Sequence, residues 1–480
     1  MNRNMVVCIR SGWYVLIGAI LVLGGGIRAS AFSAAQATSI WNSYNNSFYV
    51  GNGGNAYYRQ DQGGGQDTGD FWYNAEELEM AVDRAQQSGS AGDKTIVTAL
   101  VNGFDATYGS DWTNDTIYND DIMWACLAHL RAYFVTGSTQ TNWAVEAADN
   151  FNWVYNGNHS PGRVAPQYDS TYGGGMWWST DHSSTGTKNA CDNGPGALVG
   201  YYLSVVWPSG TGFLGQAQNM YTWEKTYLVN SSGYVYDHWG SSGLEGYDLS
   251  YNAGTFIGAA YLLGNFSTAG LVASYYMNNL SGAGGILPDW GTGGGNNDGF
   301  NGIFMRWMAL YMYDSGTEGT YSVWLYNNAA AALSVENSSG LSWDDWSAAT
   351  PTGGQYGWDC TPSVVALNVL LPTATTLNEP SVLDGGQELL NGNYAFIMQT
   401  DGNLVLYNGS TAIWASNTSG NPGAYCTMQS DGNLVVYSSS GGALWATGTN
   451  GNPGAYVTLQ TDGNVVVYSS SNVALWATGT

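Results

Sequence analysis

The 480-residue chain is poor in cations, with 11 Lys and Arg residues against 36 Asp and Glu. Proteins that bind nucleic acid need basic side chains to neutralise phosphates, so this composition excludes nucleic acid as a partner. A negative surface also repels polyanions such as pectate or teichoic acid, which favours a neutral polymer as the ligand. Solubility alone is the alternative explanation of the acidity, and composition does not separate the two.

Cysteine and histidine are also scarce, at 5 and 4 residues. The four cysteines outside the N-terminal segment, Cys126, Cys191, Cys360 and Cys426, are too few for a disulfide scaffold in a chain this long, and the sequence leaves their pairing open. No Cys/His spacing matches a zinc site. We therefore expect no metal and no cofactor, and we expect the histidines to be structural or incidental.

No apolar run reaches the roughly 20 residues that span a bilayer. The longest N-terminal stretch, Trp13–Leu23, follows two arginines and precedes Ala29-Ser30-Ala31, which is the order of a secretory signal. We expect residues 1–31 to be a signal peptide, cleaved after Ala31 or Ala35. The mature protein is then secreted, has no stable membrane association and carries a charge of about −28, from 8 basic and 36 acidic residues.

A nine-residue pattern occurs three times near the C-terminus, starting at positions 399, 429 and 460. Each copy has Gln, Asp, Asn, Val and Tyr at alternate positions, and the Asp is followed by Gly. Asp-Gly between alternating apolar runs predicts a hairpin, and a fixed period of about 31 residues predicts repeated units of antiparallel sheet. In such a hairpin the polar groups and the Val methyls converge on one small site for hydroxyl groups.

The pattern resembles the Q-x-D-x-N-x-V-x-Y motif of the bulb-type mannose-specific lectins, over residues 378–480. That resemblance implies an all-β β-prism of three subdomains, in which Asp and Asn bind the axial 2-hydroxyl of mannose, Gln and Tyr bind neighbouring hydroxyls and Val packs on the ring. Turn formation alone is the other explanation of Asp and Asn, but it does not require Gln and Tyr. The implied mannose-binding residues are Gln399, Asp401, Asn403, Val405, Tyr407, Gln429, Asp431, Asn433, Val435, Tyr437, Gln460, Asp462, Asn464, Val466 and Tyr468.

The preceding region, 37–374, has helical periodicity interrupted by Gly, Asn, Ser and Pro clusters. An even number of helices with alternating short and long connections suits six helical hairpins closed into a ring. Loops on a rigid scaffold commonly carry function, so long connections at one end predict a groove there. The twelve predicted segments are 37–50, 77–89, 95–109, 117–137, 141–156, 193–208, 213–230, 250–265, 269–281, 300–316, 320–337 and 362–374.

Asp120 and Asp121 are consecutive carboxylates at the predicted start of a helix. Neighbouring carboxylates repel, so that one tends to keep its proton while the other ionises, and this supplies an acid and a nucleophile. Retaining glycosidases hold such a pair about 5 Å apart. Helix starts also favour acidic residues for capping, which is the competing explanation.

Four further motifs accompany the pair in order: Gly173-Gly174-Gly175-Met176-Trp177-Trp178, Lys188-Asn189-Ala190-Cys191-Asp192-Asn193, Tyr251-Asn252-Ala253-Gly254 and Gly302-Ile303-Phe304-Met305-Arg306. Together they resemble glycoside hydrolase family 76 over residues 37–374. The resemblance implies an all-α (α/α)6 barrel and a retaining endo-α-1,6-mannanase, with Asp120 as nucleophile and Asp121 as general acid/base. The residues predicted to bind substrate are Trp177, Trp178, Tyr172, Asn189, Asn193, Asn252 and Trp124; Arg306 is expected to form a structural ion pair.

The two resemblances rest on separate residues and imply the same sugar. We therefore predict a multidomain protein whose partner is α-mannan or another mannose-containing polysaccharide: a secreted mannan hydrolase with an attached mannose-binding module. Two alternatives remain, a cell-wall mannan transglycosidase and a mannan-binding protein without catalysis. The polar ending Ala477-Thr478-Gly479-Thr480, which differs from a lipid-anchor signal, and the Asp120-Asp121 pair favour the hydrolase.

Overall fold

The computed structural model describes residues 32–66, 71–160, 163–183, 186–280, 285–291 and 293–480. The predicted signal peptide, 1–31, lies outside these ranges. Within them, no helix combines the length and the apolar character needed to cross a membrane. The four cysteines in the described ranges are buried free thiols.

The first part of the described chain contains twelve α-helices, the number expected from the sequence. Local signals explain several of their ends: Ser33 and Gln36 form a capping box before the first helix, and Gly316 ends the tenth in the left-handed conformation. The helices are α1 (Ala34–Phe48), α2 (Phe71–Ser88), α3 (Ala91–Tyr108), α4 (Asn119–Val135), α5 (Thr141–Asn156), α6 (Ala190–Val206), α7 (Phe213–Tyr227), α8 (Ser250–Leu262), α9 (Phe266–Asn279), α10 (Phe300–Ser315), α11 (Glu318–Ser334) and α12 (Gly357–Val369).

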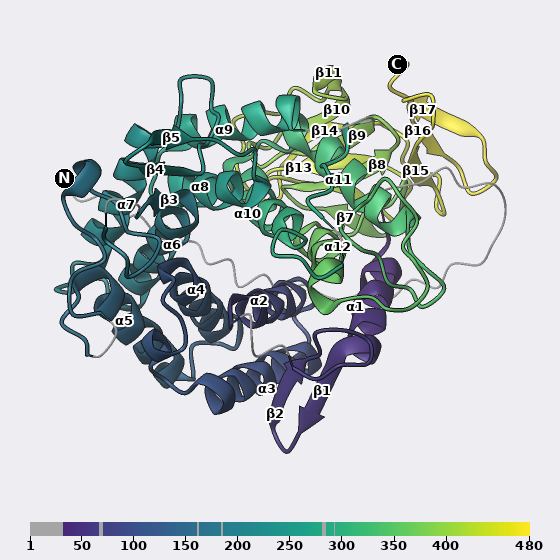
Figure 1. The fold of residues 1–480 in the computed structure, drawn as a ribbon. Coiled ribbons are helices and arrows are strands. Elements are labelled where there is room, and N and C mark those ends of the chain that lie inside the picture. Colours follow the sequence, from purple (N-terminus) through teal and green to yellow (C-terminus); the bar gives the residue numbers. More distant parts are fainter. Residues whose placement is uncertain (1–31, 67–70, 161–162, 184–185, 281–284, 292) are drawn as a thin grey trace.

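The even-numbered helices form a closed series (Figure 1). Each contacts the next even-numbered helix, and α12 contacts α2, while the odd-numbered helices pack against their even-numbered neighbours. Aromatic contacts bring the N-terminal ends of the inner helices together: Trp72 of α2 contacts Trp124, Phe300 and Trp358, and Tyr251 of α8 stacks on Phe300 at 3.9 Å. The long connections therefore gather at the end where these helices begin.

Buried ion pairs cross the middle of this helical part. Arg306 of α10 donates to Glu76 and Asp83 of α2 at 2.8 Å each, and Arg131 of α4 donates to Asp83 at 2.6 Å and also to Glu79. All five side chains are nearly inaccessible to solvent, so the charges compensate one another in a medium of low dielectric. This confirms the structural role predicted for Arg306.

Short strands accompany the helices, and the C-terminal region consists mainly of strands. β1 (Tyr49–Asn52) and β2 (Asn55–Tyr58) form a hairpin, and β3 (Lys188–Asn189), β4 (His238–Gly240) and β5 (Gly243–Glu245) form a small sheet. The remaining strands are β6 (Thr376–Asn378), β7 (Ser381–Leu383), β8 (Gln387–Asn391), β9 (Tyr394–Met398), β10 (Leu404–Asn408), β11 (Thr411–Ala415), β12 (Tyr425–Met428), β13 (Leu434–Tyr437), β14 (Ala443–Ala446), β15 (Tyr456–Leu459), β16 (Val465–Tyr468) and β17 (Ala474–Ala477).

These C-terminal strands form three four-stranded antiparallel sheets, one for each sequence repeat: β8–β11, β12–β14 with β7, and β15–β17 with β6. Alternate residues such as Leu404 and Leu406 point into a shared core. The three repeated tryptophans, Trp414, Trp445 and Trp476, contact one another edge-on at 5.3–5.7 Å, so they pack internally instead of offering faces to a sugar.

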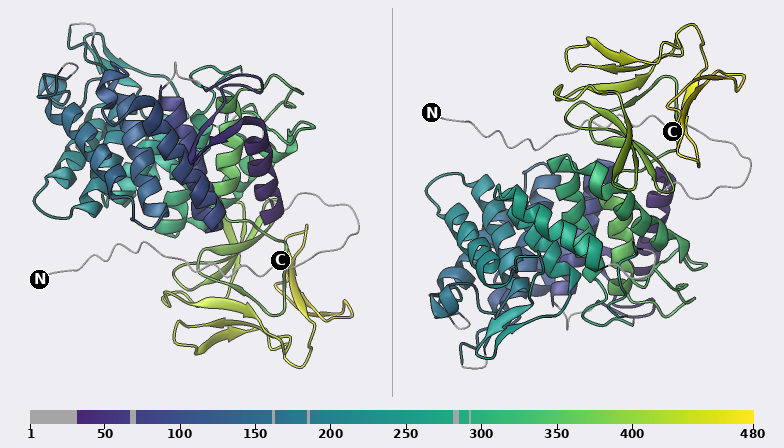
Figure 2. Two further views of the ribbon diagram at one scale, coloured as in Figure 1. Left: turned by 90° about the horizontal axis from the view of Figure 1, so that it is seen from below. Right: turned by 90° about the horizontal axis from the view of Figure 1, so that it is seen from above.

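The strand-rich region lies to one side of the helices (Figure 2). Helix α11 contacts β9 and β11 of the first sheet. Leu390, Ala395 and Ile397 of that sheet belong to the same hydrophobic core as the helices. A cavity of about 220 Å³ lies at this junction, lined among others by Tyr326, Leu371 and Glu388.

Candidate functional site

Asp120 and Asp121 occupy the first turn of α4, at the end of the helical part where the long connections gather. The helix starts there because the backbone of Tyr118 is extended. The next residue, Asn119, is held by two hydrogen bonds: its backbone N–H donates to the Trp178 carbonyl, and its side-chain amide donates to the Trp177 carbonyl. The acidic pair is thereby fixed against the loop that carries both tryptophans.

Asp120 is half-buried as a residue, but its Oδ1 is enclosed and has no hydrogen-bond partner. Burial raises the pKa of Asp120 to about 6, and hydrogen bonds from the Cys191 thiol, the backbone amides of Asp120 and Asp121 and the Trp178 side chain oppose this rise. The surrounding protein therefore opposes the ionisation of Asp120.

A third carboxylate lies close to the pair. Asp192, in the first turn of α6, is fully buried, and burial followed by the charges of Asp120, Asp121 and Asp237 raises its pKa well above the ordinary range. The surroundings of Asp192 therefore favour its neutral form over its ionised form. The sequence did not single out Asp192, Asp237 or Cys191 as site residues. Asp192 and Cys191 belong to the Lys188–Asn193 motif, which was their only signal, and Asp237 had none.

Asp121 accepts a hydrogen bond from the Thr116 hydroxyl at 2.6 Å. The buried Arg163 holds this approach segment, because its guanidinium donates to the carbonyls of Thr113 and Thr116 at 2.9 Å and to Asn119 Oδ1 at 3.2 Å. Burial lowers the pKa of Arg163 to about 10, against the raising effect of Asp121. Asp121 therefore has the Arg163 cation nearby, whereas the neighbour of Asp120 is the buried acid Asp192.

An exposed aromatic pair flanks the carboxylates. Trp178 is 39% exposed and Tyr118 is 38% exposed, and their ring centroids are 4.7 Å apart. Trp178 thus keeps an accessible surface, as expected for a residue that stacks on sugar C–H groups. The sequence did not identify Tyr118, although it directly precedes the helix that carries the pair.

Trp177 and Trp124 differ from the expectation of a sugar platform. Trp177 is 2% exposed, donates its indole N–H to Asp169 at 2.9 Å and stacks on His182. Trp124 is 1% exposed and packs between Trp72 and Tyr251. Neither ring has a free face, because the neighbouring aromatic residues and the loop cover both.

The three predicted asparagines are also buried, and their hydrogen bonds go to the protein. Asn193 accepts from the Met176 amide and donates to the Asn189 carbonyl, which fixes the glycine-rich loop. Asn189 Oδ1 accepts from the Thr187 hydroxyl at 2.7 Å. Asn252 donates to Asp237 at 3.0 Å, so it orients an acid of the site. Their role is positional in this structure, where sugar contacts were expected.

Tyr172 lies in the glycine-rich loop with a left-handed backbone, φ 54°. Its ring lies 5.8 Å from that of Trp177, and its carbonyl accepts from the Trp223 indole. The loop is held by Lys188, whose buried ammonium donates to Asp169 Oδ1 at 2.7 Å and to the carbonyls of Thr171 and Gly174. Burial raises the pKa of Asp169, but hydrogen bonds from Lys188 and Trp177 outweigh this effect and lower the pKa to about 2.

In the C-terminal region each repeat brings its five motif residues together as the sequence predicts. Gln399 lies just after β9, Asp401 and Asn403 form the turn, and Val405 and Tyr407 lie on β10. In every copy the Gln side chain donates to the Tyr hydroxyl, and the Asp Oδ1 accepts the Asn backbone N–H. The second Asp oxygen and the Asn amide nitrogen are then the groups available for hydroxyls.

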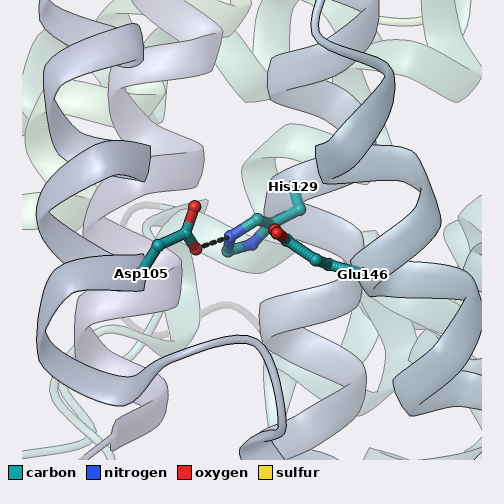
Figure 3. A group of neighbouring side chains, drawn as sticks. All are labelled: Asp105, His129 and Glu146. Carbon is teal, nitrogen blue, oxygen red and sulfur yellow. Dashed lines mark hydrogen bonds and ion pairs between the residues drawn. The ribbon is translucent and has the colours of Figure 1, made fainter.

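One group in the described ranges has the composition of a metal site: Asp105, His129 and Glu146 (Figure 3), whose ligand atoms lie within 4.8 Å of one another. His129 Nδ1 lies 2.8 Å from the Ala125 carbonyl and Nε2 lies 3.0 Å from Asp105 Oδ1. Both ring nitrogens therefore already face oxygen atoms of the protein. The group lies nine residues along α4 from Asp120, about 13 Å away, and takes no part in the acidic site.

The arrangement of the helices has known counterparts. The sequence profile of glycosyl hydrolase family 76 matches residues 32–382. The chain belongs to this family. The GH76A α-1,6-mannanase of Salegentibacter sp. is 24% identical with a TM-score of 0.60, over 70% of this chain and 98% of that chain. A family 76 glycoside hydrolase (mannosidase) of Bacteroides thetaiotaomicron is 18% identical with a TM-score of 0.56, over 70% and 96%. At these identities the structural likeness shows the fold.

The repeats are similar to plant lectins. The mannose-specific lectin of Narcissus pseudonarcissus is 58% identical over 38 residues, which are 8% of this chain and 35% of that protein. The mannose-specific lectin of Galanthus nivalis is 45% identical over 60 residues, 12% of this chain and 34% of that protein. The chain thus matches about a third of the length of these relatives. The family 76 membership and the lectin similarity confirm both resemblances seen in the sequence.

Proposed function

We propose that this family 76 protein is a secreted endo-α-1,6-mannanase that retains anomeric configuration, and that its C-terminal repeats bind mannose in the substrate. The observation that carries the proposal is the Asp120–Asp121 pair in the first turn of α4, next to the exposed Trp178. A related structure supports it: an inactive Salegentibacter variant with two consecutive aspartates replaced is in complex with α-1,6-mannotriose.

In the proposed reaction, Asp120 attacks the anomeric carbon while Asp121 protonates the departing glycosidic oxygen. Asp121 then removes a proton from water, which releases the sugar from Asp120 with retained configuration. Asp192 contributes by staying neutral, because a third negative charge would oppose ionisation of Asp120. Trp178 and Tyr118 supply aromatic surface for the sugar rings.

The proposal includes an architecture and a division of labour. The closed series of even-numbered helices supports an (α/α)6 barrel over 37–374, and the three sheets support a β-prism over 378–480. Residues 1–31 are proposed as the signal peptide of the secreted form. The weak mannose sites of the C-terminal module would keep the helical part close to an insoluble polymer by raising its effective concentration there.

Product analysis tests the proposal. The protein is incubated with linear and branched α-mannans and the sizes of the products are followed. We expect oligosaccharides of intermediate length, no turnover by Asp120→Asn, and wild-type turnover by the control Asp149→Asn on the exposed face of α5. Products longer than the starting oligosaccharides would favour the transglycosidase, and intact mannan with every variant would favour a binding protein.

A further inference from the structure

The three lectin-like repeats have the same motif but different surroundings. Along β10, Leu404 and Leu406 point into the core shared by the three sheets, so Val405 and Tyr407 face outward. In the second and third repeats the corresponding tyrosines, Tyr437 and Tyr468, are not among the residues packed against the core of the helical part. In the first repeat Tyr407 packs against the core of the helical part.

The cross-strand neighbours of the motif also differ in the first repeat. In the second and third repeats the motif Tyr faces another Tyr across the strands, with ring centroids 5.7 and 5.6 Å apart, and the motif Val faces Thr. In the first repeat Tyr407 faces Ala395 and Val405 faces Ile397. Ala395 and Ile397 are fully buried in the core of the helical part. The sequence of this repeat therefore fits a covered face.

Helix α11 covers that face. At Gly319, a Cβ atom would lie 2.3 Å from Tyr407 Cζ and 2.5 Å from its hydroxyl, so the ring touches the helix backbone. At Gly316, in the turn before α11, a Cβ atom would lie 2.5 Å from the Thr400 hydroxyl. Thr400 is half-buried, whereas its counterparts Ser430 and Thr461 are exposed.

We propose that the first repeat is the docking surface between the C-terminal module and α11, and that the full-length protein binds mannose only at its second and third repeats. A sugar packed on Val405 and bonded to Tyr407 would need the space that α11 fills. The inference rests on the proposed mannose binding and narrows it to two sites, those of Asp431 and Asp462.

The docking position also separates binding from the acidic pair. The contact lies at the C-terminal end of α10 and the start of α11, and α10 has 16 residues, which corresponds to about 24 Å. The inner helices begin at the end where Asp120 lies. The open repeats therefore hold mannan at a distance from the acidic site, beyond the opposite end of the helices.

Retention of the full-length protein on mannose-agarose tests the inference. Asp→Asn keeps the Oδ1 that accepts the turn N–H in every repeat, so Asp401→Asn, Asp431→Asn and Asp462→Asn are matched. We expect Asp401→Asn to be retained like wild type and the double variant Asp431→Asn/Asp462→Asn to lose retention at least tenfold. The inference would be overturned if the three single variants lost retention equally. It would also be overturned if the double variant were still retained and lost that retention when Asp401→Asn was added. No retention of wild type would instead refute mannose binding by the module.

A second variant opens the covered site. Gly319→Ala, made in the double variant, should displace Tyr407 from α11 and restore retention, and adding Asp401→Asn should abolish it again. Gly215→Ala in α7 is the control, because a Cβ atom there has no neighbour within 4 Å. Two outcomes would contradict the docking surface. One is restored retention by both glycine variants. The other is no restored retention by Gly319→Ala although circular dichroism and melting show that this variant is folded and altered at the junction.

Discussion

At the residue scale, the protein uses its few cations as internal counter-ions. Five of the eight Lys and Arg residues in the described ranges are buried, and each donates to carboxylates or carbonyls of its own fold: Arg84, Arg131, Arg163, Lys188 and Arg306. Of the other described cations, Lys225 is exposed, and Arg59 and Lys94 are half-buried. The surface is therefore nearly free of positive charge, which suits a neutral polysaccharide better than a polyanion.

The ionisation of Asp120 predicts how activity depends on pH. A nucleophile must be deprotonated, and the pKa of Asp120 is raised to about 6, so the rate should fall as pH decreases through about 6. The measurement is kcat/KM on soluble α-1,6-mannan oligosaccharides from pH 4 to 8, with melting followed in parallel. If Asp120 were the general acid, the rate would instead fall as pH rises through about 6.

Trp177 and Trp178 are neighbours with different predicted effects. Trp178→Ala should raise the mannan concentration needed for half-maximal rate several-fold and hardly change the melting temperature, because the ring is exposed. Trp177→Ala should cost about 3 to 5 kcal/mol of stability, as is typical of a buried Trp. Steady-state kinetics and thermal melting of both variants check this, and a large loss of stability in Trp178→Ala would place that ring in the core.

At the element scale, the segment 169–178 is a glycine-rich loop with little regular structure that is ordered by one ammonium group. The Lys188 ammonium donates to four acceptors on Asp169, Thr171 and Gly174, and it also lies 4.9 Å from the centroid of the Trp177 ring. Gly173, Gly174 and Gly175 all have positive φ, and Cβ atoms at Gly173 and Gly175 would collide with Tyr227 and Trp223. The loop thus holds its shape through backbone packing and this cation.

Removal of the ammonium should therefore disorder the loop. Lys188→Met removes the donor to the buried Gly174 carbonyl, at about 1 to 3 kcal/mol for an unsatisfied buried group. We expect a lower melting temperature, faster proteolysis within 169–178 and a strong loss of mannan turnover. Lys225→Met, an exposed change, is the matched control. Unchanged proteolysis of the loop in Lys188→Met would show that the glycine packing suffices.

At the scale of the whole molecule, two buried carboxyl groups lie where the helices meet the first sheet. Burial raises the pKa of Glu318 to about 7, with Asp401 and Asp314 adding to the rise, and raises the pKa of Glu388 to about 8, with Glu318 adding. Ser322 donates to Glu388 at 2.7 Å, which partly opposes the shift. Both groups are more easily ionised when the junction opens.

The junction should accordingly be most stable in acid. In the folded protein these carboxyl groups stay protonated at pH values above 4.5, the ordinary pKa of glutamate. Their contribution to the free energy of unfolding is therefore complete below about pH 4.5 and is lost as pH rises through about 7 to 8. Melting of wild type and of Glu318→Gln/Glu388→Gln between pH 5 and 9 checks this. The variant should gain stability relative to wild type as pH rises, and parallel curves would exclude the two groups.

Much of the fold follows from local patterns. Helix α5 has the predicted bounds 141–156, and the Asp-Gly turns form the hairpins at the predicted positions. The start of α12 was predicted five residues late, because Pro362 was taken as its first residue. The helix begins at Gly357 and contains Pro362. Proline has no N–H to donate to the Trp358 carbonyl four residues earlier, and that carbonyl accepts a hydrogen bond from the Thr361 hydroxyl instead.

The sequence by itself determined the helices, the hairpins, the acidic pair and the three motifs, because each depends on periodicity or on residues within one turn. Tertiary structure decided which tryptophan stays open, which buried acids approach Asp120 and which repeat is covered. Asp192 approaches both Asp120 and Asp237 only because the closed series of helices joins segments that are far apart in the sequence. The contact of α11 with Tyr407 likewise has no local signal, since it depends on how two folded regions pack together.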